Sequence, residues 1–138
     1  GEKKAVEEAG VLLKEAGAKR VLPLKVSGPF HSPLLESAGE KLSEELAKVE
    51  FHELDVPYYA NVTAAKVTDK AEIVPLLAKG VSSPVRWQQS VEAMIADGAD
   101  TFVEIGPGRT LAGFLKKINP GVKVYHVAAW ENMESLVQ

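Results

Sequence analysis

Apolar residues recur at helical spacing in some stretches of the chain and form short apolar runs in others. Spacings of three and four predict helices over residues 3–16, 33–49, 69–79, 83–97, 109–118 and 131–137. Short runs rich in aliphatic and aromatic residues predict strands over residues 21–26, 56–60, 101–105 and 123–127. This alternation is typical of an α/β domain with a mainly parallel sheet.

Turn residues set the expected limits of these helices. Ser32-Pro33 and Ser83-Pro84 each place an N-cap residue before a proline at the first helical position. Asp69 and Glu72 have capping-box spacing, and Gly80 is expected to end the helix that they open. About three strands belong to the later sheet, fewer than a typical sheet contains. The pattern therefore predicts part of a larger fold.

The composition narrows the classes of partner. The 138 residues are 46% hydrophobic and carry a formal net charge of -3, which does not favour a nucleic-acid binder. There is no cysteine, which excludes disulfides and thiolate metal sites and is compatible with a reducing cytoplasm. No apolar run approaches the length of a membrane span, and no signal peptide is visible. We therefore expect a cytoplasmic globular domain that binds neither nucleic acid nor membrane.

His31 is the first candidate for chemistry. It lies between an apolar run and an amphipathic helix, and such strand-to-helix junctions often hold the active sites of α/β folds. Gly28-Pro29 before it and Ser32-Pro33 after it restrict the backbone, which suits a general base of fixed position. A capped or core histidine without a catalytic role is an equally good interpretation of placement alone. His52 and His126 lie too far along the chain to give metal-ligand spacing with His31, so no metal site is predicted.

Two further patterns bear on mechanism. No serine of the chain lies in a Gly-x-Ser-x-Gly nucleophile elbow, which is the usual serine site of such folds. Glu104-Ile105-Gly106-Pro107-Gly108 joins a predicted strand to a predicted helix and could hold an anion at the helix N-terminus. A tight strand-to-helix turn is the favoured interpretation of that stretch. Trp87 is expected in the core.

Four motifs together resemble one family. Their order along the chain is that of the bacterial malonyl-CoA:acyl carrier protein transacylases, and they resemble the C-terminal half of that enzyme. The motifs are Gly28-Pro29-Phe30-His31-Ser32, Pro57 with Asn61-Val62, Ser83-Pro84-Val85-Arg86-Trp87, and Glu104-Ile105-Gly106-Pro107-Gly108 with Leu111.

The resemblance implies a fold and a reaction. It implies a partial α/β-hydrolase-like parallel sheet with flanking helices over residues 27–138, preceded over residues 1–26 by the last helix and strand of a ferredoxin-like small subdomain. The implied enzyme moves a malonyl group from coenzyme A to the phosphopantetheine thiol of acyl carrier protein through a serine ester. Malonyl-CoA is a substrate, and no cofactor is implied.

Roles carry over to few residues. The resemblance assigns His31 as the base that deprotonates the serine, and Gly80 as the position whose backbone carbonyl accepts a hydrogen bond from that histidine. Phe30 matches the malonyl-selective version of its motif, where a bulky ring would crowd a branched acyl group. The family's serine elbow and carboxylate-binding arginine belong to its N-terminal half. We therefore expect these 138 residues to be inactive alone and to need that half supplied by a partner.

Three other functions stay open. Acyltransferase domains of polyketide synthases share the histidine motif, so the chain could be a fragment of one. A non-catalytic module could bind carrier protein, or associate with itself, through apolar surface. A small-anion binder could use the Gly106-Pro107-Gly108 turn.

Overall fold

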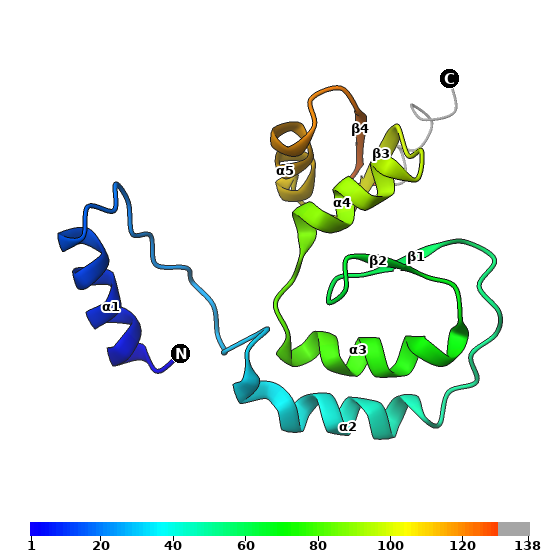
Figure 1. The fold of residues 1–138 in the computed structure, drawn as a ribbon, viewed down its shortest axis with the longest axis horizontal. Coiled ribbons are helices and arrows are strands. Elements are labelled where there is room, and N and C mark those ends of the chain that lie inside the picture. Colours follow the sequence, from blue (N-terminus) through cyan, green and yellow to red (C-terminus); the bar gives the residue numbers. More distant parts are fainter. Residues whose placement is uncertain (130–138) are drawn as a thin grey trace. The chain divides into compact units, whose positions relative to one another are not determined.

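The computed structural model describes residues 1–129, so the helix predicted over 131–137 lies outside the described part of the chain. The fold is mixed α/β, as predicted (Figure 1). Its backbone divides into two compact units, one of Gly1–Glu50 with Val74–Pro84 and one of Phe51–Ile73 with the residues from Val85 onward. No helix among the described residues is long and apolar enough to cross a membrane.

The first unit is helical. It contains α1 (Lys3–Glu15), the 3-10 turn η1 (Pro33–Leu35), α2 (Glu36–Leu46) and all but the first residue of α3 (Ile73–Ser82). The helices α2 and α3 lie side by side (Figure 1). Gly39 of α2 is buried at this contact, and a Cβ atom there would lie 2.7 Å from the carbonyl oxygen of Ala78. The two helices can approach this closely because Gly39 has no side chain.

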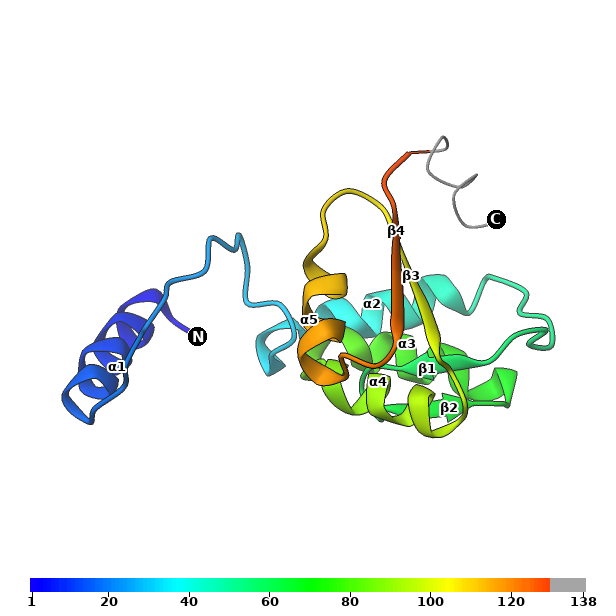
Figure 2. The ribbon, with the colours of Figure 1, turned by 90° about the horizontal axis from the view of Figure 1, so that it is seen from above.

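The second unit contains two small sheets. The hairpin of β1 (Tyr58–Ala60) and β2 (Ala65–Val67) is antiparallel. Parallel strands β3 (Thr101–Ile105) and β4 (Lys123–Val127) pair in register from Thr101 with Lys123 to Ile105 with Val127, and α5 (Thr110–Ile118) connects them (Figure 2). Helix α4 (Trp87–Ala96) contacts both β1 and β2. The side chains that form the core of this unit are Ala60, Val67, Ile73, Val91, Ala112, Leu115 and Val127.

A hydrogen bond joins the hairpin to the end of α4. The phenol of Tyr59 donates to the carboxylate of Asp97, the residue that follows the helix. This hydrogen bond raises the pKa of Tyr59 above its ordinary value, because the neutral phenol is the form that donates.

The predicted strand over residues 21–26 is wrong, because this segment forms no strand in the structure. Pro23 has no N–H to donate to a neighbour, and Leu22, Leu24 and Val26 are exposed. A strand forms only where a second strand satisfies its backbone, and the apolar content of 21–26 does not supply one. The assignment of residues 1–26 to a ferredoxin-like small subdomain stays a prediction. It includes the helix α1 but no longer the strand expected over residues 21–26.

The strands over 101–105 and 123–127 are confirmed, and one face of β3 is more exposed than the other among the described residues. Its burial alternates, with Ile105 81% exposed and Val103 43% exposed, whereas Phe102 and Glu104 are partly buried. Helix α5 contacts both strands of this pair. Among the described strands, β2 was not predicted. It has three residues, two of them exposed, which is too short for a recognisable alternation of apolar and polar positions.

Several helix limits differ from the sequence prediction. The helix expected from residue 83 begins at Trp87, because the backbone N–H of Arg86 donates to the carbonyl of Asn61 at 2.9 Å and Arg86 is not helical. The helix opened by Asp69 passes through Gly80 to Ser82, so Gly80 does not end it. Asp69 itself caps as predicted, accepting from the N–H of Ala71 at 2.8 Å.

Ser32-Pro33 opens a 3-10 turn, and α2 follows it. The hydroxyl of Ser32 donates to the carbonyl of Pro29 at 2.7 Å, so it makes no capping hydrogen bond. The helix then ends at Leu46, three residues before the predicted limit.

Candidate active site around His31

The backbone of His31 has a left-handed conformation, with φ of 57°. This region is uncommon for residues other than glycine, and it persists only where the surroundings impose it. Here the N–H of His31 donates to the carbonyl of Val81 at 3.2 Å, and Ser32 closes the turn through its bond to Pro29. The position of His31 is therefore set by backbone contacts on both sides of it.

The imidazole of His31 makes a second contact with the same helix. Its Nδ1 lies 3.0 Å from the carbonyl oxygen of Gly80. A carbonyl can only accept, so Nδ1 carries the hydrogen and Nε2 keeps the basic lone pair. The side chain is exposed, which leaves Nε2 accessible.

Helix α3 explains why both contacts exist. The last four carbonyls of an α-helix have no partner within the helix, and Gly80 and Val81 belong to the last turn of α3. His31 satisfies one of these carbonyls with its backbone N–H and the other with its ring N–H.

Phe30 precedes this histidine and is 61% exposed. Its ring folds back over Gly28, where a Cβ atom would lie 3.5 Å from the ring. The side chain is therefore available for contact with another molecule.

Glu104, in the fourth sequence motif, has a role that the sequence did not reveal. Its two carboxylate oxygens accept from the N–H groups of Leu111 and Ala112, at 3.1 and 2.8 Å, at the start of α5. The strand-to-helix turn between them uses left-handed backbone at Gly106 and Gly108. The chain's own carboxylate thus occupies the place that an external anion would take at the N-terminus of α5. This geometry favours the interpretation of residues 104–108 as a tight strand-to-helix turn.

Removing this carboxylate is expected to destabilise the chain. Glu104→Ala leaves two amides at the start of α5 without their partner, one of them partly buried, and we expect the free energy of unfolding to fall by about 1–3 kcal/mol. Denaturant unfolding followed by circular dichroism measures the change. Glu44→Ala, at an exposed position of α2, is the matched control and is expected to change it by less than about 0.5 kcal/mol. Equal midpoints for the two variants would contradict the capping role.

The other two histidines lie apart from His31 in the sequence and have different surroundings. His52 is exposed, and Nε2 of His126 lies 3.0 Å from the carbonyl of Gly106 at the end of β3. Among residues 1–129, no three His, Asp or Glu side chains form a group that could hold a metal ion. Trp87 is half-buried, and its indole nitrogen is buried without a hydrogen-bond partner in the described structure.

Comparison with known proteins relates the sequence and the fold of the chain to acyltransferases. No protein-family model matches the chain. The chain is 46% identical over all of its 138 residues to the malonyl CoA-acyl carrier protein transacylase of Bacillus subtilis, and 46% identical over 118 residues to that of Salmonella typhimurium. It covers 44% and 38% of these two proteins, so it spans less than half the length of the curated relatives that it matches.

Solved structures agree with the sequence relatives. The crystal structure of MCAT from Streptococcus pneumoniae superposes with a TM-score of 0.90 at 46% identity, over 99% of this chain and 45% of that one. The acyl carrier protein S-malonyltransferase of Vibrio cholerae gives a TM-score of 0.89 at 41% identity, with 99% and 44% of the two chains covered.

The chain is thus related, over its whole length, to acyltransferases of mixed α/β fold. Those relatives are malonyl-CoA:acyl carrier protein transacylases, and the resemblance that the four sequence motifs predicted is confirmed.

Proposed function

We propose that this chain supplies the catalytic histidine of a malonyl-CoA:acyl carrier protein transacylase. The serine nucleophile and the arginine for the malonyl carboxylate come from polypeptide outside these 138 residues. The observation that carries the proposal is the geometry of His31. Its ring and its backbone are both fixed on the end of α3, and the basic nitrogen is free.

The proposed reaction has two balanced steps. In the first, Nε2 of His31 takes the proton of the serine hydroxyl while the serine oxygen attacks the thioester carbon of malonyl-CoA. The carbon–sulfur bond breaks, and the coenzyme A thiolate leaves with the proton from His31. In the second, His31 deprotonates the phosphopantetheine thiol of the carrier protein, whose sulfur attacks the serine ester. The serine oxygen then leaves and recovers its proton.

Fixed position is what a base of this kind requires. The carbonyl of Gly80 orients the imidazole and selects the tautomer with hydrogen on Nδ1, a task that a buried carboxylate performs in serine proteases. The dipole of this carbonyl also stabilises the imidazolium that forms in each step. Gly80 is therefore proposed as a positioning residue that acts through its backbone.

Phe30 is proposed to contribute to acyl selectivity. Its exposed ring adjoins the histidine in sequence, and a bulky ring in this place would reject acyl groups branched at the α-carbon.

One relative favours a second carrier protein as acceptor. The chain is 38% identical, with a TM-score of 0.89, to a malonyl-transacylase solved in complex with a type II PKS acyl-carrier protein. The acceptor could accordingly belong to fatty acid or to type II polyketide synthesis. Transfer to both kinds of carrier protein, assayed side by side, distinguishes these acceptors.

Mixing experiments test the proposed function. The 138-residue chain is combined with a polypeptide that contains the part of the Bacillus subtilis relative outside the matched region. We expect no malonyl transfer from coenzyme A to carrier protein by either polypeptide alone and measurable transfer by the mixture, because the base and the nucleophile act as a unit. Transfer by the 138-residue chain alone at the mixture's rate would contradict the proposal.

A further inference from the structure

Ser32 lies at the start of a helical segment, but its hydroxyl does not cap that segment. A serine in this position commonly accepts an N–H group of the first turn, and Ser32 makes no such bond. Its hydroxyl turns back along the chain and donates to the carbonyl oxygen of Pro29 at 2.7 Å, in a part-buried contact. The side chain of Ser32 therefore stabilises the loop that precedes η1.

The hydrogen bond from Ser32 to Pro29 spans the left-handed backbone of His31. Phe30 and His31 are the central residues of a turn, and His31, the third of its four residues, has φ of 57°. Turns with a left-handed third residue favour glycine or asparagine there, because a larger side chain crowds the backbone. The hydroxyl of Ser32 joins the two ends of this turn, so it favours the conformation that a histidine otherwise avoids.

The backbone of His31 also determines where its ring lies. Nδ1 of His31 is 3.0 Å from the carbonyl oxygen of Gly80, but this contact is exposed. Because water competes for exposed hydrogen bonds, the contact with Gly80 alone holds the ring weakly. The contact of the Ser32 hydroxyl is shorter and part-buried. A fixed orientation of the imidazole therefore depends on the backbone from which the ring projects.

We propose that Ser32 is a positioning residue for the base, and that it acts through the backbone of His31. Its hydroxyl keeps His31 left-handed, which holds Nδ1 at the carbonyl of Gly80 and leaves Nε2 free. Without the hydroxyl, His31 leaves the left-handed region, and the ring loses its fixed direction and its fixed tautomer. The consequence for malonyl transfer rests on the proposed function, whereas the consequence for the ring does not.

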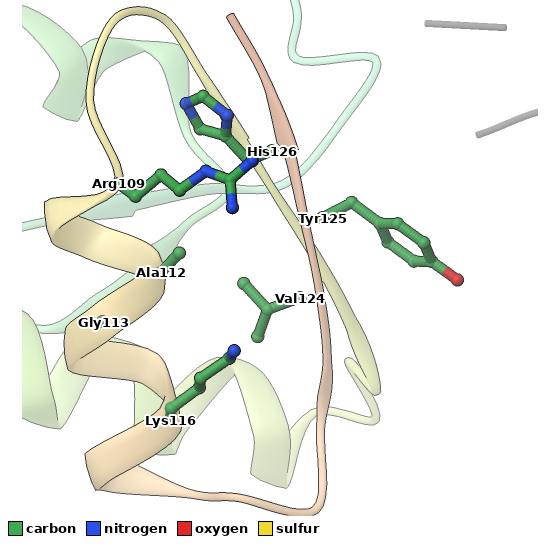
Figure 3. Close-up of a pocket in the computed structure, with 7 residues that line it drawn as sticks. All are labelled: Arg109, Ala112, Gly113, Lys116, Val124, Tyr125 and His126. Atoms are coloured by element: carbon green, nitrogen blue, oxygen red, sulfur yellow. The ribbon is translucent and has the colours of Figure 1, made fainter. Parts of the chain in front are cut away.

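The three histidines of the chain allow the ring to be examined without catalysis. Nδ1 of His31 and Nε2 of His126 each lie 3.0 Å from a backbone carbonyl, so the two rings are expected to carry hydrogen on opposite nitrogens. Figure 3 shows the ring of His126 beside the guanidinium of Arg109, and both residues belong to the second unit. The ring of the exposed His52 serves as the unrestrained reference.

Long-range proton–nitrogen correlation spectra of the 138-residue chain report the tautomer of each ring. They are recorded at about pH 8.5, where an ordinary histidine is neutral. Ser32→Ala is expected to move the ring signals of His31 toward those of His52 and to leave those of His126 unchanged. Ser37→Ala, at an exposed position of α2, is the matched control and is expected to leave all three rings unchanged. Unchanged His31 signals in Ser32→Ala would overturn the proposal.

Two further variants isolate the hydroxyl and replace Ser32→Ala if that variant does not fold. Ser32→Thr keeps the hydroxyl, and Ser32→Val has nearly the shape of threonine without it. The extended backbone of Ser32, with φ of -132° and ψ of 162°, accepts β-branched side chains. We expect the original His31 tautomer in Ser32→Thr and a mixture of tautomers in Ser32→Val. Equal His31 spectra for these two variants would contradict the role of the hydroxyl.

Malonyl transfer by the mixed polypeptides tests the consequence for catalysis. Ser32→Ala is expected to lower kcat tenfold or more with KM for malonyl-CoA unchanged, because a misplaced base loses rate and not substrate binding. Ser32→Thr is expected to restore most of the lost kcat. An unchanged kcat in Ser32→Ala would overturn the proposal and leave the proposed function intact. If mixing gives no transfer but Ser32→Ala releases the ring, Ser32 still positions His31 and the proposed function fails.

Discussion

His31→Gln is expected to reduce malonyl transfer by the mixed polypeptides by about 10²–10⁴-fold in kcat/KM, the usual effect of removing a general base. Glutamine can still donate an N–H to the carbonyl of Gly80, so the contact with α3 can persist. Its amide cannot accept a proton from serine or from the carrier-protein thiol. The initial rate of malonyl-carrier formation, with unfolding measured in parallel, separates lost chemistry from lost structure.

His52→Gln is the matched control for this prediction. His52 is exposed, and we expect its replacement to leave the rate within about twofold of the unchanged mixture. If His31→Gln retained more than about a tenth of the activity, His31 would not be the base. A loss of activity that followed a loss of folded protein would make His31 a structural residue at the end of α3.

Gly39→Val is expected to destabilise the first unit strongly. The added Cβ atom would lie 2.7 Å from the carbonyl oxygen of Ala78, which is backbone and can move only with α3. Overpacking of this kind costs about 1–3 kcal/mol, and the few tenths gained by removing a glycine from a helix do not offset it. The free energy of unfolding, from denaturant titration, measures the effect.

Gly113→Ala, a glycine replacement in another helix, is expected to raise the stability of the chain. Gly113 lies inside α5, and a Cβ atom there meets nothing within 4 Å. Because alanine favours the helix more than glycine does, we expect the chain to gain about 0.5–1 kcal/mol of stability. If both variants changed stability by the same amount, the close approach of α2 and α3 at Gly39 would not determine the result.

Patterns that act over short distances predicted most of the elements. Each strand of the β3–β4 pair followed from a five-residue apolar stretch bounded by turn residues, and α5 from helical spacing after Gly108. Asp69 was predicted as a cap from its spacing to Glu72, and the N–H that it accepts from belongs to Ala71, two residues away. The predictions failed where a residue far away in the sequence determines the local structure. Arg86 delays α4 through a bond to Asn61, and residues 21–26 have apolar side chains but no neighbouring strand.

Local sequence patterns likewise predicted only part of the candidate site. His31 could be singled out from its neighbours Gly28, Pro29 and Pro33, all within three residues of it. Its left-handed backbone and its two contacts with α3 could not be predicted from these neighbours. They depend on the helix continuing past Gly80 to Ser82.

Intact-mass measurement after brief exposure to malonyl-CoA is the most direct test of His31 as the base that activates a serine on another polypeptide. The sample contains the 138-residue chain and the polypeptide with the remaining part of the transacylase. We expect one malonyl group on that second polypeptide, gained only when the 138-residue chain is present and lost with His31→Gln. A malonyl group on the 138-residue chain itself, or acylation of the second polypeptide at the same rate without it, would show that His31 is not this base.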